Sequence, residues 1–141
     1  MIALVTGTSR GIGRAIAAQL AVEGAHVLCH ARRAKDARAV AAELGGTPVW
    51  GDLSNAEGVA AVARQATDAA PALQLLVHNA AVNPRPDERL EDAELATFRA
   101  VHAVNVEAPL LLTQALHGPL RAGAPSQVIV VSSEEIGRAH V

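Results

Sequence analysis

The residues with the clearest chemical implication form a glycine-rich turn near the start of the chain. An apolar run ends at Val5, and the segment Thr6-Gly7-Thr8-Ser9-Arg10-Gly11-Ile12-Gly13 leads directly into a helical pattern. Glycine lets the backbone approach a pyrophosphate closely, and the free N–H groups at the start of the helix stabilise its negative charge. In this strand–turn–helix context the pattern predicts a phosphate site; the alternative is an ordinary glycine turn. The predicted contacts are Gly7, Ser9, Arg10, Gly11, Ile12 and Gly13.

A second signal follows the next apolar run. An acidic residue about 20 residues beyond the glycines would pair with the ribose 2′-hydroxyl of NAD. Here Ala31 is followed by Arg32 and Arg33. A guanidinium forms charge-assisted hydrogen bonds with a 2′-phosphate, whereas a carboxylate repels it. Arg32 therefore favours NADP(H) over NAD(H); the alternative is that both arginines are solvated surface charges.

The elements that must position these residues alternate along the chain. Short apolar runs bounded by turn residues predict buried strands, and apolar residues at helical spacing predict helices. We expect Ser54 to cap the third helix and Pro71 to end it, and we expect Pro109 to kink or divide the fourth. The expected strands are 2–5, 26–29, 48–50, 74–77 and 127–131, and the expected helices are about 12–23, 34–44, 56–70 and 92–120.

This βαβαβαβαβ order predicts an α/β fold, a Rossmann-type doubly wound parallel sheet with helices on both faces. In such sheets ligands bind beyond the carboxyl ends of the strands. The loops that matter most should therefore follow Val5, Cys29, Trp50, Val77 and Val131.

The spacing Thr-Gly-x3-Gly-x-Gly resembles the short-chain dehydrogenase/reductase family. The resemblance covers the chain from Ile2 to about Ser133. The turn is similar to that of 3-oxoacyl-acyl-carrier-protein reductases, although many members of the family share it. In this family an arginine before the second glycine and another after the second strand commonly mark NADP(H), and Arg10 and Arg32 match both places.

The resemblance also implies contacts for the rest of the cofactor. Asp52 would bond the adenine amino group, and Leu53 would contact the ring through its backbone; without the resemblance, Asp52 is a simple turn residue. His78-Asn79-Ala80-Ala81 stands where the family has Asn-Asn-Ala-Gly, so Asn79 and Ala80 match, with Asn79 stabilising the central sheet. His78 departs from the pattern and is interpreted as a packed strand-end residue. Ala81 adds a methyl group where backbone usually runs close to the cofactor.

For the chemistry, the resemblance implies hydride transfer between the nicotinamide and a small-molecule carbonyl/alcohol substrate. Asn105 aligns with a catalytic asparagine that organises a water in the proton relay. Ser133 aligns with the catalytic serine that bonds the substrate oxygen, although Ser132 is also possible. The family's general acid is the Tyr of a Tyr-x-x-x-Lys pair beyond this serine, and the sequence contains no tyrosine. We therefore expect the chain to be inactive alone; the alternative is a non-catalytic dinucleotide-binding module.

Composition limits the remaining possibilities. The chain has 141 residues, half of them hydrophobic, and a formal net charge of -2, which argues against disorder and against nucleic acid as a partner. No apolar run is long enough for a membrane helix, and the six histidines lack metal-ligand spacing. The single Cys29 suits a reducing compartment, so we expect a cytoplasmic protein.

The last residues raise a separate hypothesis. Ile136-Gly137-Arg138-Ala139-His140-Val141 is what ATC GGA AGA GCA CAC GTC encodes, and this string matches a widely used sequencing adapter. We expect residues 1–134 to be an incomplete NADP(H)-binding domain, truncated after the fifth strand, and 135–141 to be a non-native tail; a chance polar tail is the alternative. The family packs its long helix across a subunit interface, so the parent is expected to be a homo-oligomer.

Overall fold

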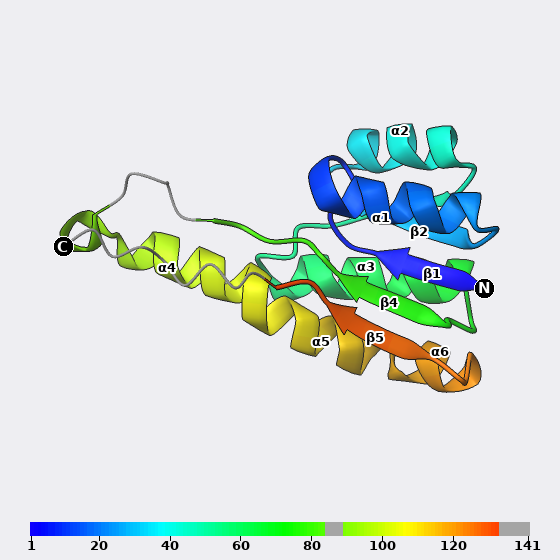
Figure 1. The fold of residues 1–141 in the computed structure, drawn as a ribbon. Coiled ribbons are helices and arrows are strands. Elements are labelled where there is room, and N and C mark those ends of the chain that lie inside the picture. The colour runs from blue at the N-terminus through cyan, green and yellow to red at the C-terminus, as the bar shows by residue number, and fades with distance from the viewer. Residues whose placement is uncertain (84–88, 133–141) are drawn as a thin grey trace.

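The computed structural model describes residues 1–83 and 89–132. Strands and helices alternate along this part of the chain as the sequence pattern predicts (Figure 1). The elements are β1 (Ile2–Val5), α1 (Gly11–Val22), β2 (His26–Ala31), α2 (Ala34–Leu44), β3 (Thr47–Trp50), α3 (Ala56–Ala69), β4 (Leu75–His78), a 3-10 turn (Leu90–Asp92), α4 (Leu95–His102), a π-helical turn (Ala103–Glu107), α5 (Ala108–Ala115), α6 (His117–Ala122) and β5 (Gln127–Val130).

The strands form one parallel sheet in the order β3-β2-β1-β4-β5. Strand order reverses beside β1, because β2 and β3 lie on one side of it and β4 and β5 lie on the other. Such a switch point opens a crevice at the carboxyl ends of the central strands. The predicted Rossmann-type fold is therefore confirmed.

Helices cover both faces of the sheet (Figure 1). One core cluster lies on the α1 and α2 side and contains Val5, Val27 and Cys29. The other lies on the α3 and α5 side and contains Leu4 and Leu112. Aliphatic side chains and alanines build both clusters, so a chain with so few aromatic residues still has a continuous core.

Several predicted boundaries shift by one or two residues. Strand β2 extends past Cys29 to Ala31, because its last residues pair with β3. Strand β4 runs to His78, and β5 ends at Val130. The predicted cap of α3 was wrong: the Asn55 side chain, not that of Ser54, accepts a hydrogen bond from the N–H of Gly58 at 2.8 Å.

The long helix predicted over 92–120 is divided. After the 3-10 turn, α4 passes into a π-helical turn and then into α5, and a further break at Leu116 separates α6. Pro109 explains the π turn, because an α-helix would need the missing N–H of residue 109 to bond the carbonyl of Asn105. The N–H of Ala108 instead bonds the carbonyl of Ala103.

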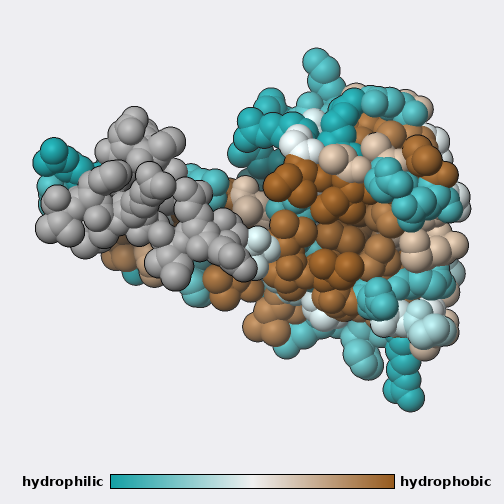
Figure 2. All heavy atoms as spheres, viewed as in Figure 1, coloured by the Kyte–Doolittle hydropathy of each residue, from teal (hydrophilic) through white to brown (hydrophobic). Residues whose placement is uncertain are grey.

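Among the described residues, strand β5 pairs with β4 alone and forms one edge of the sheet, with β3 at the other. Its Val128, Ile129 and Val130 are 44%, 45% and 58% exposed, which is high for apolar residues of a parallel sheet. Apolar surface gathers over this edge in the view of Figure 2. None of the helices in the described part of the chain is long and apolar enough to span a membrane.

Candidate functional site

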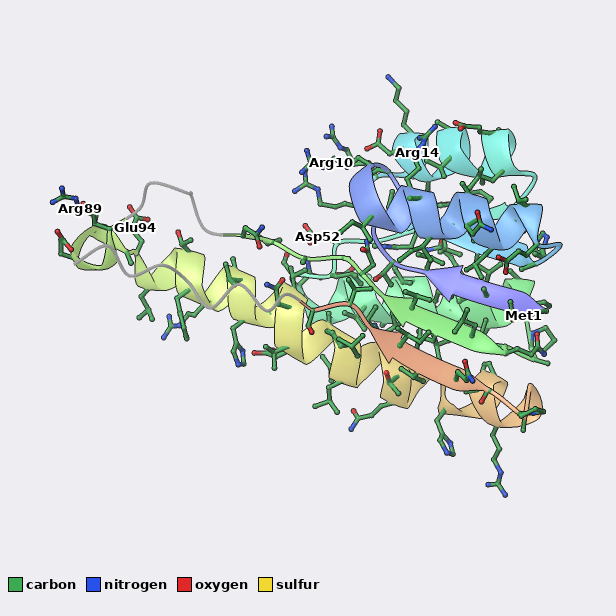
Figure 3. All side chains as sticks on the ribbon, in the orientation of Figure 1. Met1, Arg10, Arg14, Asp52, Arg89 and Glu94 are labelled. Carbon is green, nitrogen blue, oxygen red and sulfur yellow. The ribbon has the colours of Figure 1, made fainter. Side chains whose placement is uncertain are left out.

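A cleft of about 1080 Å³ lies at the carboxyl ends of the strands, at the switch point between β1 and β4. Figure 3 shows Arg10 and Asp52 at this end of the sheet, far from Met1 at the other. The cleft collects residues from four loops that are distant in sequence. Its lining includes ten of the predicted cofactor contacts, namely Gly7, Ser9, Arg10, Gly11, Ile12, Arg32, Asp52, Leu53, Asn79 and Ala80.

The amino end of α1 opens into this cleft without a capping side chain. Arg10 occupies the cap position in extended conformation, its side chain makes no capping hydrogen bond, and no acidic residue lies in the first turn. By contrast, α3 has the Asn55 cap and Glu57 in its first turn. The N–H groups and positive dipole end of α1 are therefore free to bind an anion, whereas those of α3 are partly neutralised.

Three glycines shape the phosphate turn for different reasons. Gly7 and Gly11 have φ angles of +72° and +59°, a region that favours glycine. A Cβ on Gly7 would lie 2.9 Å from the Cα of Ala80, whereas one on Gly11 would meet no atom within 4 Å. Gly13 does not line the cleft; a Cβ there would overlap the Asn79 amide and the Gly7 carbonyl. Gly13 thus allows α1 to pack closely behind the turn.

Asn79 and Thr6 connect the phosphate turn to β4. The side-chain nitrogen of Asn79 donates to the carbonyls of Thr6 and Gly7 at 3.0 and 3.3 Å. The Thr6 hydroxyl oxygen accepts hydrogen bonds from the N–H groups of Asn79 and Ala80, both at 2.9 Å. The Asn79 side chain therefore braces the turn, and the Thr6 hydroxyl is a site element that the sequence motif did not single out.

His30 is a second residue that the sequence did not single out. Its ring is buried at the cleft, where Nδ1 lies 3.1 Å from the Gly7 nitrogen and Nε2 lies 3.0 Å from the Gly51 carbonyl oxygen. Its backbone carbonyl also accepts hydrogen bonds from the Thr8 N–H and hydroxyl, at 2.8 and 3.0 Å. The only signal in the sequence was a histidine at the end of an apolar run.

Positive charge gathers at the end of β2. Arg33 pairs with Asp36 at 3.5 Å on the exposed start of α2. Arg32 and Arg10 line the cleft and form no ion pair with another described residue. No acidic side chain stands at the end of β2 itself, so this part of the cleft suits a phosphate better than a bare hydroxyl.

Asp52 and Leu53 line the cleft just after β3. The Asp52 carboxylate accepts a hydrogen bond from the Ser54 N–H at 2.9 Å. This bond, the Ser54 hydroxyl and the nearby Arg32 lower the pKa of Asp52, so the carboxylate is charged at neutral pH. Leu53 turns its side chain into the core, which leaves its backbone to line the cleft.

Asn105 lies in the π-helical turn rather than in a regular helix. Its side-chain nitrogen donates to the Val82 carbonyl at 2.9 Å, and its side-chain oxygen accepts from the Val82 N–H at 2.8 Å. Both bonds hold the loop that follows β4 against this turn. Asn105 does not line the cleft itself, but its neighbour Val104 and its partner Val82 do.

The remaining predicted residues lie at the β4–β5 edge. Ser133 and the tail 135–141 fall outside the described residues, while Ser132 is exposed just past β5. His78 is buried, and its Nε2 lies 2.9 Å from the Thr113 hydroxyl, which confirms the predicted packed strand-end residue. Ala81 needs no strained backbone, since no described residue other than glycine has a positive φ.

Taken together, the donors suit a dinucleotide phosphate group rather than a metal. The free N–H groups of α1, two arginines and the open space at Gly11 are complementary to an anion. Among the residues that the structure describes, no three His, Cys, Asp or Glu side chains form a group that could hold a metal ion.

Comparisons with known proteins agree with this geometry. The family model for short chain dehydrogenases matches residues 1–140. Dehydrogenase/reductase SDR family member 4 of Sus scrofa is 33% identical over 99% of this chain and 50% of its own length. The chain thus spans about half the length of this curated relative.

Two solved structures have the same architecture. A metagenomic short-chain oxidoreductase in complex with NADP is 37% identical, with a TM-score of 0.83 over 94% of this chain and 61% of its own. The L-sorbose reductase of Gluconobacter frateurii, complexed with NADPH and L-sorbose, is 29% identical, with a TM-score of 0.83 over 94% of this chain and 52% of its own. With a matching family model and matching folds, the chain belongs to the short chain dehydrogenase family.

Proposed function

We propose that this chain is the dinucleotide-binding part of an oxidoreductase that transfers a hydride between NADP(H) and a small-molecule carbonyl/alcohol substrate. One observation carries the proposal: the uncapped amino end of α1 opens into the switch-point cleft beside Arg10 and Arg32. The two solved structures described above were obtained with NADP and NADPH, which supports this cofactor. Residues 1–134 are proposed as the native part of the domain.

Each wall of the cleft has a role in this proposal. The N–H groups of α1 and the turn residues Gly7, Ser9, Gly11 and Ile12 would hold the pyrophosphate. Arg10 and Arg32 would pair with the 2′-phosphate. Asp52, Leu53 and Ala80 would contact the adenosine and nicotinamide sides, while Asn79 and Gly13 keep the turn in place from behind.

When bound, the nicotinamide supplies or accepts the hydride. Asn105 and Ser133 are proposed for the substrate side, Asn105 to organise a water and Ser133 to bond the substrate oxygen. The π turn supports the role of Asn105, because Pro109 deprives its carbonyl of the usual α-helical partner. Its side-chain amide is already used by Val82, so the backbone carbonyl is the group left for a water.

The proton donor that the family resemblance implies is a tyrosine, and this chain has none. We therefore propose that the isolated chain binds the cofactor without reducing a substrate. A non-catalytic binding module is the second candidate, and the absence of tyrosine is what favours it. The coding DNA after codon 134 separates the two: a Tyr-x-x-x-Lys motif there supports the oxidoreductase.

Two further proposals concern partners and location. The exposed Leu95, Phe98 and Leu110 on α4 and α5 support self-association of the parent through these helices. The single Cys29 is buried, and burial raises the pKa of its thiol to about 11. An inert thiol of this kind is consistent with the proposed cytoplasmic location.

Titration of the purified chain with NADPH and with NADH tests the cofactor assignment. Binding can be followed through the single Trp50, which ends β3 next to Gly51 of the cleft lining. Replacing Arg32→Asp should lower the NADPH-to-NADH affinity ratio by about 100-fold, because a charge-assisted bond is lost and a repulsion is gained. Arg64→Asp is the matched control, since Arg64 is exposed on α3 and does not line the cleft. An unchanged ratio in Arg32→Asp would overturn the NADP(H) assignment.

A further inference from the structure

His30 joins two turns that the sheet places on either side of it. Its ring lies between the phosphate turn after β1 and the Gly51-Asp52 turn after β3. The parallel registers bring this about, because β2 pairs with β1 on one side and with β3 on the other. His30 is 3% exposed, and both of its ring nitrogens are within hydrogen-bond distance of backbone groups.

The chemistry of those two partners determines the protonation state of the ring. A backbone N–H can only donate, so Nδ1 must be unprotonated to accept from Gly7. A carbonyl can only accept, so Nε2 must carry the proton that it donates to Gly51. The structure therefore requires the neutral imidazole with its proton on Nε2.

The Gly7 N–H is the group through which the His30 ring contacts the phosphate turn. On its other side, the carbonyls of Thr6 and Gly7 are held by the Asn79 amide. The next residue, Thr8, bonds the His30 carbonyl through both its N–H and its hydroxyl. The turn is therefore braced from β4 by Asn79 and from β2 by His30, and its first glycine has a positive φ that the chain must hold in place.

We propose that His30 is a positioning residue of the cofactor site, which as the neutral imidazole holds the phosphate turn in its anion-binding geometry through the Gly7 N–H. This inference rests on the proposed function, because it assumes that the cleft binds a dinucleotide. It assigns His30 no contact with the cofactor and no part in hydride transfer.

Protonation of His30 would break this arrangement. A proton on Nδ1 would turn this nitrogen into a donor, so two donors, Nδ1–H and the Gly7 N–H, would face each other. The turn would then have to move. The charged groups on the surrounding elements are Arg10 in the phosphate turn, Arg32, Arg33 and Asp36 at the end of β2 and the start of α2, and Asp52 and Glu57 at the β3–α3 junction. Burial lowers the pKa of His30, although the Gly51 bond and the Asp52 charge act in the opposite direction. Because His30 in the folded chain takes up its proton only below its ordinary range, cofactor affinity should stay full at pH 6.5 and above and should fall only once the pH drops below that lowered pKa.

Two amide substitutions separate the two ring bonds. Asn carries its side-chain oxygen at the same number of bonds from Cα as His Nδ1, so His30→Asn can keep the acceptor for Gly7 and loses the donor to Gly51. Gln carries its side-chain nitrogen at the same number of bonds as His Nε2, so His30→Gln can keep the donor to Gly51 and loses the acceptor for Gly7. Neither amide titrates in this range.

NADPH titration of the full chain at pH 8 compares these variants. We expect His30→Asn to bind within about threefold of the original chain and His30→Gln to bind about tenfold more weakly, because only Gln leaves the half-buried Gly7 N–H without its acceptor. Down to pH 6.5 the original chain should hold its affinity, because the lowered pKa keeps the His30 ring neutral there. Equal affinities of the two variants at pH 8 would overturn the proposal.

A cofactor-free measurement distinguishes failure of this inference from failure of the proposed function. Nitrogen NMR of the His30 ring should show the Nε2-protonated neutral tautomer at pH 8. Hydrogen exchange at the Gly7 amide should be slow in the original chain and in His30→Asn, and faster in His30→Gln. If these signals are as expected and NADPH does not bind, the proposed function fails while the bracing role stands. If the ring is protonated or carries its proton on Nδ1, the inference fails whatever binds.

Discussion

Gly13 in α1 and Asn79 after β4 pack so closely that a side-chain carbon at position 13 would overlap the Asn79 amide. The same carbon would overlap the Gly7 carbonyl, to which Asn79 donates a hydrogen bond. Helix, turn and strand end thus meet at one contact behind the candidate site. A glycine whose φ is ordinary is needed here for space alone.

Replacing Gly13→Ala should therefore disrupt both packing and binding. Because the obstructing atoms include backbone, we expect a loss of about 1–3 kcal/mol in the free energy of unfolding and a weaker affinity for NADPH. Urea unfolding followed by Trp50 fluorescence measures the first effect. Gly118→Ala is the matched control, since that glycine lies in α6 with no atom within 4 Å of an added Cβ. It should leave stability unchanged or raise it by up to about 1 kcal/mol. Equal stabilities of the two variants would contradict the packing argument.

The pair formed by Asn105 and Val82 gives a second prediction. Asn105→Ala removes both bonds that hold the loop after β4, and we expect a loss of about 1–2 kcal/mol in the free energy of unfolding. Hydrogen exchange at the Val82 amide should accelerate by more than exchange in β1. Gln114→Ala, an exposed position on α5, serves as the control and should change neither measurement. An unchanged hydrogen-exchange rate at the Val82 amide would show that the loop is held by other contacts.

His78 predicts a dependence of stability on pH. Burial lowers its pKa from 6.5 to about 4, so the unfolded chain binds its proton more readily than the folded chain does. The contribution of His78 is therefore complete above pH 6.5 and is lost as the pH falls toward 4, a change on the order of 3 kcal/mol. Burial shifts the pKa of His30 in the same direction, so its effect has the same sign.

Urea unfolding at a series of pH values measures this dependence. His78→Gln keeps a donor toward the Thr113 hydroxyl but has no proton to gain, so its stability should fall less between pH 6.5 and 4. A pH profile identical to that of the original chain would mean that His78 is protonated in the folded state as readily as in the unfolded state.

The start of α3 supplies a test of a single cap. Asn55→Ala removes the acceptor of the Gly58 N–H and should cost about 1 kcal/mol of stability. Ser54→Ala leaves that bond intact and should cost clearly less. Asn55→Ser should recover most of the loss, because serine caps nearly as well. Thermal unfolding of the three variants ranks them, and a larger loss in Ser54→Ala would restore serine as the cap.

Alternation of apolar runs and glycine turns was sufficient to predict the fold. The glycine turn and the start of α1 were predicted equally well, because glycine spacing and the following helix are local properties of the chain. Helix 34–44 was predicted with its observed bounds, since alanine periodicity ends at a glycine pair. Where two neighbouring residues could each do the same task, as with Ser54 and Asn55, sequence alone chose wrongly.

What could not be predicted depends on contacts between distant segments. His30 gains its two partners only when β1, β2 and β3 pair in register, so the residues next to it in the sequence do not indicate its role. The Val82 partner of Asn105 likewise comes from a loop far along the chain. Pro109 was recognised as an interruption, but the π turn before it, with its effect on Asn105, depends on how α4 and α5 continue through the break.

The strand order has a consequence for how this sheet can form during synthesis. Strand β2 adds beside β1, β3 beside β2, β4 on the free side of β1, and β5 beside β4. Each strand that leaves the ribosome therefore finds its neighbour already made and an open edge to join, and none has to insert between two earlier strands. Growth of this kind needs no rearrangement of pairs already formed, so the nascent chain can bury apolar surface step by step while translation continues.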